Sequence, residues 1–348
     1  MRCPTLAELP APPGGRTGWP WTVETPQITH AMPDGTPWPQ VTVVTPSYNQ
    51  GEFVEETIRS VLLQGYPDLE YMIVDGGSTD GTVAVVRKYE RWLAHWVSEP
   101  DRGQSDAINK GWSLAKGDIL AYLNSDDTYM PGAVQTAAAF LGQHPDVGMV
   151  HGGCNIIDEH SRLKQRYRTG DFKIEKVLCG SPSPIAQPSA FVRRAVIDDV
   201  GPLDVDMDMA MDLDLWVRIA LRYSIAHIPQ VLANARFHPG TKTLSDASPF
   251  LPNRSAILNK TFSNPALPVR LKMLEAKARN GLEAQAAFRR GRLALLDEDW
   301  NAAEADFKTA FARGPSYIKV RAVLGLLLAR ATIDMEWLAW LLRKRRLK

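Results

Sequence analysis

The sequence predicts an α/β protein with a mainly parallel, doubly wound sheet, followed by a helical C-terminal extension. Three observations support this fold class. Short apolar runs alternate with segments of helical periodicity between residues 41 and 151. The first run, Val41–Thr45, is β-branched, as strands buried on both faces usually are. From about Pro252 the chain becomes rich in Ala, Leu and Arg. The β-α alternation implies parallel strands joined by right-handed crossovers.

Composition places the chain among ordinary globular proteins. Its 348 residues are 45% apolar and 23% charged, enough for one large α/β domain of roughly 200–250 residues and an appendage. The formal net charge is +1, so no overall field favours nucleic acid as a partner.

Cysteine usage and hydropathy bear on the compartment. The three cysteines, Cys3, Cys154 and Cys179, lack the spacing of a metal site or a redox pair, which indicates free buried thiols in a reducing compartment. There is no basic-then-apolar leader and no apolar run of about 18 residues. We therefore expect a cytoplasmic protein without a transmembrane helix.

The N-terminal 40 residues form a proline-rich arm. They contain nine prolines, each of which removes a backbone donor and disfavours helices and central strands. Trp19, Trp21 and Trp38 are candidates to anchor it. The predicted organisation is an arm over 1–40, an α/β domain over 41–250 and a helical extension over 251–348.

The first half of the α/β domain shows the clearest alternation. Strands are expected at Val41–Thr45, Tyr71–Val74, His95–Ser98 and Asp118–Leu123. Helices are expected at Phe53–Gln64, Thr82–Arg91 and Gln104–Ala115, and Pro131 is expected to open another at a favoured first-turn position.

The pattern is looser in the second half of the domain. Strands are expected at Val147–His151, Arg162–Thr169, Ser189–Val192 and Val231–Phe237. Helices are expected at Phe172–Cys179 and Asp212–Arg222, the second because its apolar residues recur at helical spacing.

The helical extension contains one repeat-like pattern. The spacing of Gly291, Ala303, Phe307, Ala310 and Pro315 matches a single tetratricopeptide-like helical hairpin. An ordinary helix pair that covers apolar surface would fit the same residues.

The end of the chain combines apolar and basic residues. Val320–Leu342 is apolar with a few charges, and it precedes the basic tail Arg343–Lys348. Trp337 and Trp340 beside that tail would suit an interfacial helix on anionic lipid, with peripheral attachment to the inner face of the plasma membrane. Packing against the main domain with a solvated tail is the alternative.

Three polar turns follow predicted strands: Thr45–Asn49, Asp75–Gly81 and Asn124–Asp127. In open α/β sheets, ligands bind just beyond the carboxyl ends of the strands. The Asp126–Asp127 pair in the third turn therefore suggests a phosphorylated ligand held through Mg²⁺ or Mn²⁺, since both cations prefer oxygen ligands. An N-cap pair for the next helix is the structural alternative.

The second turn combines glycines with an acidic strand end. Gly76, Gly77 and Gly81 allow positive φ and close approach of a ligand. Asp75 could accept a hydrogen bond from a base or a ribose. The turn matches neither the GxGxxG dinucleotide fingerprint nor a GxxxxGK[ST] phosphate loop.

The chain resembles family 2 glycosyltransferases over roughly residues 40–240. The resemblance is carried, in the expected order, by Val43–Asn49, Val74–Thr82, Glu99–Gly111 and Leu123–Asp127. It implies a GT-A fold, a nucleoside-diphosphate sugar donor, a divalent metal and inversion at the anomeric carbon.

The resemblance also implies roles for individual residues. By position, the nucleoside would be held by Pro46, Ser47, Tyr48 and Asp75. Arg102 and Asp106 would line the donor pocket. Asp126 would contact ribose or sugar, and Asp127 would ligate the metal. The family often has an aspartate where this chain has Asn124, which leaves that position's share in metal binding open.

The family's general base usually opens a helix in an acidic segment that here reads Met211–Trp216. Asp212 takes the base position, where a carboxylate could deprotonate an acceptor hydroxyl. Met211 replaces the usual acidic neighbour. Asp214 is the rival base, and helix capping is the structural alternative for both aspartates.

Two further segments resemble functional parts of the family. His238 follows the last predicted strand, where related enzymes place a histidine on the metal or the diphosphate, and Arg236 could make a similar anionic contact. An ordinary loop histidine is the alternative. Gln187-Pro188-Ser189 would lie beside the acceptor cleft.

These observations predict an inverting glycosyltransferase. It would move a sugar from a UDP-, dTDP- or GDP-sugar to a hydroxyl of a glycan or a lipid-linked acceptor. A non-catalytic nucleotide-sugar-binding or scaffold protein is the alternative, and the departures at Asn124 and Met211 favour it. A nucleotidyltransferase fits less well because Pro46–Asn49 is not a glycine-rich phosphate loop. The sequence does not fix the sugar, the base or the acceptor.

Overall fold

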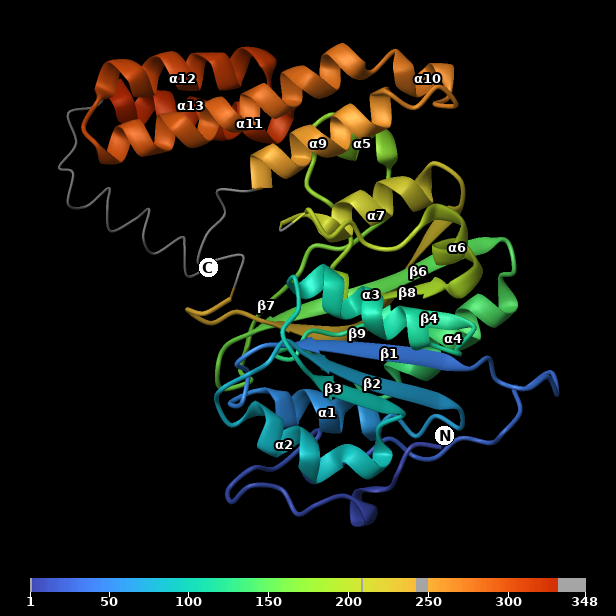
Figure 1. Cartoon of the computed structure of the whole chain (residues 1–348). Coiled ribbons are helices and arrows are strands. Elements are labelled where there is room, and N and C mark those ends of the chain that lie inside the picture. Colours follow the sequence, from blue (N-terminus) through green and yellow to red (C-terminus); the bar gives the residue numbers. More distant parts are fainter. Residues whose placement is uncertain (1, 208, 242–249, 331–348) are drawn as a thin grey trace. The chain divides into compact units, whose positions relative to one another are not determined.

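The computed structural model describes residues 2–207, 209–241 and 250–330 (Figure 1). The chain divides into two compact units: the first comprises Met1–Phe172 and Pro184–Thr241, the second Lys173–Ser183 and Lys242–Lys348. These units do not coincide with the sequence boundaries at residues 40 and 250, which stay predictions.

The first half of the sheet is parallel, as the alternation predicts. It consists of β1 (Val41–Ser47), β2 (Leu69–Asp75), β3 (His95–Ser98) and β4 (Ile119–Tyr122), in the order β3-β2-β1-β4. Ser47 pairs with Asp75, so β1 and β2 end at the same level. The turns that follow the two strands therefore emerge at one edge of the sheet.

The second half of the sheet is mixed. Its strands are β5 (Thr128–Tyr129), β6 (Val147–Ile157), β7 (Leu163–Arg166), β8 (Ala190–Arg193) and β9 (Ser224–Arg236). The order continues from β4 as β8-β6-β9-β5, with β7 beside β6. β8 runs antiparallel to β4 and β6, whereas β6 and β9 are parallel. Both β6 and β9 are longer than predicted, since they pair along most of their lengths.

Helices cover both faces of the sheet. Unit 1 contains α1 (Val54–Leu62), α2 (Thr82–Tyr89), α3 (Gln104–Leu114), α4 (Ala133–Gln143), α6 (Arg194–Val200) and α7 (Met211–Ala220), with short 3-10 turns η1 (Leu6–Glu8), η2 (Glu90–Trp92) and η3 (Gln187–Ser189). Figure 1 shows α1 and α2 on one side of the strands and α3 on the other. Val43 packs in the core with α1, while Gly111 of α3 lies so close to Val44 that an added Cβ would approach it to 2.6 Å.

The helix predicted from Pro131 begins two residues later, so that prediction was wrong in position. α4 starts at Ala133, and Gly132 precedes it as the N-cap with φ of 73°. Only glycine adopts this left-handed conformation without strain. Pro131 therefore belongs to the turn before the helix.

The proline-rich arm packs on the core of unit 1. Trp21 and Trp38 are buried, and the indole of Trp19 donates a hydrogen bond to the carbonyl of Tyr129 at 2.8 Å. Arg59 of α1 is fully buried and donates to the carbonyls of Pro10, Pro20 and Trp21. The irregular arm thus satisfies its carbonyls through side chains rather than through a ladder.

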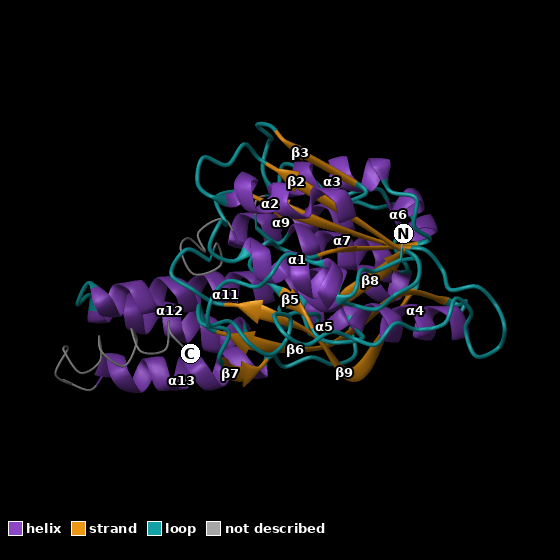
Figure 2. Cartoon of the chain, turned by 90° about the horizontal axis from the view of Figure 1, so that it is seen from below, coloured by secondary structure: helices purple, strands orange, loops and turns teal. Residues whose placement is uncertain are grey.

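Unit 2 is helical, as expected for the C-terminal extension. It comprises α5 (Ile174–Leu178), α9 (Phe250–Phe262), α10 (Val269–Lys272), α11 (Glu275–Leu296), α12 (Trp300–Arg313) and α13 (Ser316–Arg330). α11, α12 and α13 lie side by side in both views (Figures 1 and 2). Gly291 and Gly325 pack against the ring of Phe307, so two residues of the predicted hairpin pattern, Gly291 and Phe307, are in contact. The tetratricopeptide likeness itself stays a prediction.

Two expectations concern the end of the chain. The basic tail with Trp337 and Trp340 lies outside the described residues. Across the described ranges, no helix combines the length and apolarity needed to cross a membrane.

Candidate active site

The carboxylate of Asp75 organises the turn after β2. It is buried and accepts hydrogen bonds from Gly77 N at 3.2 Å and from Ser78 N and Oγ at 2.8 and 2.5 Å. Ser98 Oγ of the neighbouring β3 donates to it as well, at 2.6 Å. Asp75 lies at the predicted edge, and its oxygens already hold the turn in shape.

Hydrogen bonds connect the turn after β1 to the turn after β2. Gly76 N donates to the carbonyl of Ser47 at 2.8 Å, and Asn49 N donates to Ser78 Oγ at 2.7 Å. Pro46 is buried, while Tyr48 is 62% exposed. Among the described residues, the buried Oγ of Ser47 has no hydrogen-bond partner, an arrangement that is uncommon unless a ligand or water completes it. Tyr48 is thus accessible to a ligand, and Ser47 beside it has an unused hydrogen-bonding group.

The segment before α3 joins the same edge. Glu99 N donates to the carbonyl of Asp75 at 3.0 Å. Asp106 accepts from Arg102 N at 3.1 Å and from the Arg102 guanidinium at 3.3 Å, and the first of these bonds, together with Arg102 and Lys110, lowers its pKa despite desolvation. Arg102 itself is 73% exposed. Asp106 therefore anchors the segment that precedes α3, and Arg102 remains accessible.

The structure brings Asp126, Asp127 and His238 together. Asp126 Oδ2 lies 3.2 Å from His238 Nε2. Asp127 Oδ1 accepts from Arg236 N at 2.8 Å, and Asp127 Oδ2 accepts from Asn124 Nδ2 at 3.3 Å. His238 follows β9 and the aspartates follow β4, so strands far apart in sequence build one cluster.

The electrostatics of Asp127 are unfavourable in the free protein. Burial raises the pKa of its carboxyl well above the ordinary value, and the neighbouring charge of Asp126 raises it further. The bond from Arg236 N and the Arg236 charge act in the opposite direction but do not cancel these effects. A cation bound here would favour the ionised carboxylate.

Asn124, where the family often has aspartate, is a hydrogen-bond hub. Its Oδ1 accepts from Gln104 Nε2 at 2.6 Å, and its Nδ2 lies 3.3 Å from both Asp127 Oδ2 and Gln187 Oε1. Gln187 in turn donates to the carbonyl of Tyr122 at 2.8 Å. An aspartate could not donate to Asp127, so the amide suits this arrangement. Gln104 lies inside a resembling motif, but no local pattern in the sequence identifies it as a partner of Asn124.

Asp212 stands in the first turn of α7. Its Oδ1 accepts from Leu213 N at 2.8 Å, and burial raises the pKa of its carboxyl above the ordinary value. The charges of Asp212 and Asp127 both add to the effect of burial in raising the pKa of the Tyr122 hydroxyl. Hydrogen bonds link the two segments: Met211, next to Asp212, accepts from Ser105. Gln104, next to Ser105, donates to Asn124, which donates to Asp127. Both carboxylates therefore lie around one region.

Met211 has a packing role at the start of the same helix. It is buried, and its Sδ accepts a hydrogen bond from Ser105 Oγ of α3 at 2.8 Å. The preceding Ala210 has φ of 68°, an uncommon value for a residue with a side chain. The departure at Met211 therefore joins two helix N-termini rather than leaving a gap.

Asp214, the rival base, is committed elsewhere. It is buried, and its Oδ2 accepts from Arg218 Nε at 2.8 Å. Arg218 also donates to the carbonyls of Val200, Gly201 and Pro202. This ion pair ties α7 to the end of α6 and has an evident structural purpose.

The donor set fits a hard divalent cation that a diphosphate helps to ligate. Asp126 and Asp127 offer carboxylate oxygens, and His238 offers an imidazole nitrogen close to Asp126. Within the described ranges, no group of three or more His, Cys, Asp or Glu side chains is arranged to hold a metal by itself. In Mg²⁺-type sites, one or two carboxylates bind together with substrate phosphates.

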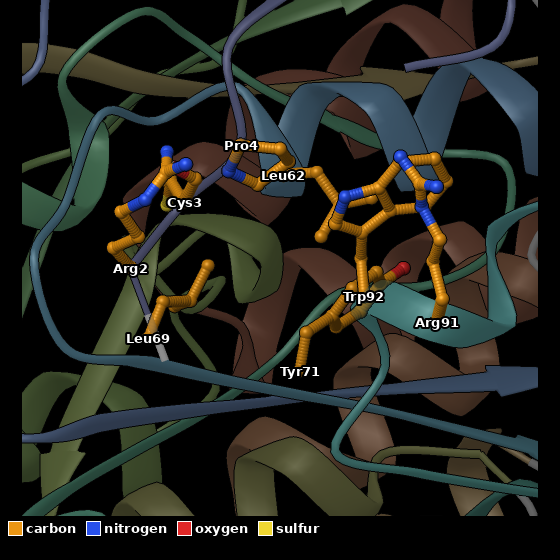
Figure 3. Close-up of a pocket in the computed structure, with 8 residues that line it drawn as sticks. All are labelled: Arg2, Cys3, Pro4, Leu62, Leu69, Tyr71, Arg91 and Trp92. Atoms are coloured by element: carbon orange, nitrogen blue, oxygen red, sulfur yellow. The ribbon is translucent and has the colours of Figure 1, made fainter. Parts of the chain in front are cut away.

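A small hollow elsewhere in unit 1 does not have these properties (Figure 3). Its lining includes Leu69, the first residue of β2, so it lies at the opposite end of that strand from Asp75. Arg2 is ion-paired with Glu8 at 2.7 Å, and Arg91 lies over the ring of Trp92 at 4.0 Å. The hollow belongs to the packing of the N-terminal arm.

Known proteins are similar to this chain in sequence. The family model described as "Glycosyl transferase family 2" matches residues 42–201. An uncharacterized glycosyltransferase of Mycobacterium tuberculosis strain H37Rv is 32% identical over 186 residues, which cover 53% of this chain and 70% of that protein.

Solved structures are similar in fold. Staphylococcus aureus TarS, residues 1–349 in complex with UDP-GlcNAc, has a TM-score of 0.60 at 17% identity, covering 82% of this chain and 89% of that one. The mannosyltransferase PcManGT of Pyrobaculum calidifontis, in complex with GDP-Man and Mn²⁺, has a TM-score of 0.58 at 21% identity, covering 93% and 87%. The GT-A fold expected from the sequence is thereby confirmed.

Proposed function

Because the chain belongs to the family 2 glycosyltransferases, we propose that it transfers a hexose from a nucleoside-diphosphate sugar to an acceptor hydroxyl with inversion. The observation that carries this proposal is the pair of carboxylates around Tyr122. Asp127 stands on the donor side with Asp126 and His238, and Asp212 opens α7 with a raised pKa. A donor site and a base around one region are what a direct displacement requires.

The donor side divides into two parts. The turns after β1 and β2 present Ser47 and Tyr48 to the nucleoside, while Asp75 keeps their shape and adds a polar edge. Arg102 and Asp106 border the sugar-diphosphate. Asp126 contacts ribose or sugar, and Asp127 with His238 would hold a divalent metal on the diphosphate. The metal, when bound, stabilises negative charge on the departing diphosphate.

Asp212 is the proposed general base. Its carboxylate would take the proton from the acceptor hydroxyl as that oxygen attacks the anomeric carbon on the face opposite the diphosphate, which yields inversion. A raised pKa makes a carboxylate a better proton acceptor near neutral pH.

A donor screen followed by turnover assays tests this proposal. Nucleotides and their sugars, including UDP-GlcNAc and GDP-Man, are tested for stabilisation of the protein with Mn²⁺, since a ligand of the folded state raises Tm. Donor hydrolysis is then measured with and without EDTA. Turnover that survives both chelation and Asp127→Ala would contradict the metal-assisted mechanism. Binding without turnover on any glycan or lipid-linked acceptor would favour the non-catalytic alternative.

Peripheral contact with a membrane is a further part of the proposal. α13 exposes an apolar stripe at helical spacing, with Val320 72% and Leu327 61% exposed, and Lys319 and Arg321 lie in the same helix. Such a face suits anionic lipid and would bring the enzyme to a lipid-linked acceptor.

Vesicle sedimentation tests the membrane contact. Phosphatidylglycerol vesicles should pull down the protein better than phosphatidylcholine vesicles, and Val320→Glu with Leu327→Glu should reduce that binding. Leu163→Glu, at an exposed apolar residue of β7, is the matched control. Equal binding by all variants would refute a role for the stripe.

A further inference from the structure

The carboxylates of the proposed donor site lie on a turn without regular structure. Residues 124–127 fall between β4 and β5 and belong to neither strand. A catalytic constellation has to be held within a fraction of an ångström to be productive. Something outside the turn must therefore fix Asp126 and Asp127.

Arg236, the last residue of β9, contacts both aspartates. Its Nε donates to the carbonyl of Asp126 at 2.8 Å, and its backbone N donates to Asp127 Oδ1 at 2.8 Å. One residue thus holds the main chain of the first aspartate and the side chain of the second.

The guanidinium of Arg236 is itself held by groups that lie outside the turn. It is fully buried, and it donates to Glu56 Oε2 of α1 at 3.1 Å. It also donates to the carbonyl of Asp158 and to Ser161 Oγ, both at 3.0 Å. Ser161 Oγ donates to the Glu56 carboxylate at 2.8 and 2.9 Å. The buried charge is therefore paired and hydrogen-bonded, as burial of a charge requires.

The ring of Phe53 also packs against the Arg236 guanidinium. It lies 4.9 Å from the Arg236 guanidinium and 4.6 Å from the His238 ring, centre to centre. Arg236 and His238 are thus packed on one buried aromatic side chain. This couples the arginine to the third proposed ligand as well as to the two aspartates.

We infer that Arg236 is a positioning residue of the donor site: paired with Glu56, it fixes Asp126 and Asp127 in the geometry that a metal–diphosphate ligand requires. This inference rests on the proposed function. Arginine suits the role because its planar fork donates in several fixed directions, whereas lysine carries one compact ammonium group. Arg236 does not reach the ligand, since its guanidinium is buried in the protein.

The test measures Mn²⁺ binding, by the electron paramagnetic resonance signal of free Mn²⁺, with UDP and separately with GDP. Arg236→Lys keeps the charge but loses the fork, and Ser161→Ala removes one support with little loss of volume. Mutation of residues that orient metal ligands typically lowers the affinity for the metal by about 10–100-fold. Arg236→Lys should therefore weaken Mn²⁺ binding at least about tenfold, with a smaller loss for Ser161→Ala.

Arg59→Lys is the matched control for damage to the fold. Arg59 is equally buried in unit 1 and also donates to main-chain carbonyls, but it contacts the N-terminal arm rather than the aspartate turn. It should lower Tm while leaving Mn²⁺ affinity unchanged. Equal weakening by Arg59→Lys and Arg236→Lys would overturn the inference.

Failure of the inference and failure of the proposed function give different results. If the wild-type protein binds Mn²⁺, Asp127→Ala abolishes binding and Arg236→Lys has no effect, the inference is wrong and the proposed function stands. If the wild-type protein binds no Mn²⁺ with UDP, with GDP or, in a further run, with dTDP, both are overturned. A loss confined to Arg236→Lys and Ser161→Ala supports the inference.

Discussion

At the scale of single residues, the two key carboxylates share an unfavourable environment. Burial raises the pKa of Asp127 and of Asp212, whereas Asp75 and Asp106 are satisfied by donors around them. Strongly perturbed acids in a cleft are candidates for ligand binding and proton transfer. The environment thus separates aspartates that organise turns from aspartates kept available for chemistry.

Asp212→Asn should remove the base without harming the donor site. We expect kcat to fall by about 10²–10⁴-fold, with nucleotide affinity unchanged. In the wild-type enzyme the acidic limb of kcat/KM should lie above the ordinary aspartate range, because the base works only when ionised and its pKa is raised. Steady-state kinetics across pH checks both points.

Asp214→Asn is the matched control for this substitution. It breaks the ion pair with Arg218 and should cost stability while preserving the acidic limb. If turnover instead vanished in Asp214→Asn and persisted in Asp212→Asn, the rival base would be correct.

Asp127→Asn should stabilise the metal-free protein at neutral pH. A carboxyl whose folded pKa is raised contributes stability that is complete below its unfolded pKa of about 3.9 and lost as pH rises through the folded value. The neutral amide avoids that loss, and its Oδ1 can still accept from Arg236 N, whereas its Nδ2 loses the hydrogen bond from Asn124 Nδ2. At pH 7.5 we expect the Tm of Asp127→Asn to exceed that of the wild type by about 2–4 °C for each kcal/mol by which its free energy of unfolding rises. Below about pH 4 we expect no increase in Tm.

Thermal unfolding with EDTA present measures this effect. Asp75→Asn is the control and should shift Tm downward, since Asp75 accepts four hydrogen bonds from its turn and from β3. A lower Tm for Asp127→Asn at every pH would contradict the electrostatic account. With Mn²⁺ and donor, the same variant should lose activity at least about 100-fold.

At the scale of elements, the sequence predicted what short-range pattern encodes. β1 to β4 were predicted because apolar runs alternate with amphipathic segments, and strand-end turns follow them. β5 has two residues and α6 is charged, so neither produces a periodic signal. The first half of β9 contains Pro229 and mixes exposed with buried positions, which hides a strand.

The ion pair of Glu56 and Arg236, which holds the aspartate turn, could not be predicted because its two residues are far apart in the sequence. Glu56 and Arg236 are 180 residues apart, and charged residues are rarely fully buried. Their pairing depends on the sheet order that brings β9 and α1 to the aspartate turn. Motif order identified Asp126, Asp127, Asp212 and His238 as candidates, but no local pattern identifies the side chains that hold them.

The helices of unit 2 offer a direct test of packing. Phe307 of α12 is buried against Gly291 of α11 and Gly325 of α13. Phe307→Ala should destabilise this unit by about 3–5 kcal/mol, because a buried aromatic ring leaves a cavity. Phe311→Ala on the same helix removes a 45% exposed ring and should change stability by less than about 1 kcal/mol. Urea unfolding of both variants checks the contrast, and equal losses would refute the packing.

At the scale of the whole molecule, one stretch of unit 2 interrupts unit 1 along the chain. Lys173–Ser183 leaves unit 1 between β7 and β8 and packs within unit 2. The carbonyl of Gly180 accepts from Gln285 Nε2 and from the Tyr317 hydroxyl, both at 2.7 Å. Gly281 approaches Cys179 so closely that an added Cβ would lie 2.4 Å from its carbonyl oxygen. The helices thus hold a segment that precedes Gln187 by a few residues in the chain.

A chain shortened to residues 1–241 should therefore keep the donor site but expose that segment. Asp75, Asp127 and Asp212 all lie in unit 1, so nucleotide binding should persist. Ile174, Val177 and Leu178 are buried in the full chain and belong to the same unit as the C-terminal helices. Without those helices, the backbone around Lys173 and Lys176 should open to trypsin, as segments without packing do. Mass spectrometry of the fragments should show cleavage at these lysines in the shortened chain and protection in the full chain. The full chain with Tyr317→Phe should be cleaved to an intermediate extent, because it loses one of the two hydrogen bonds to the carbonyl of Gly180. Equal protection of all three would mean that unit 2 does not hold the segment, and the helices would then need another explanation.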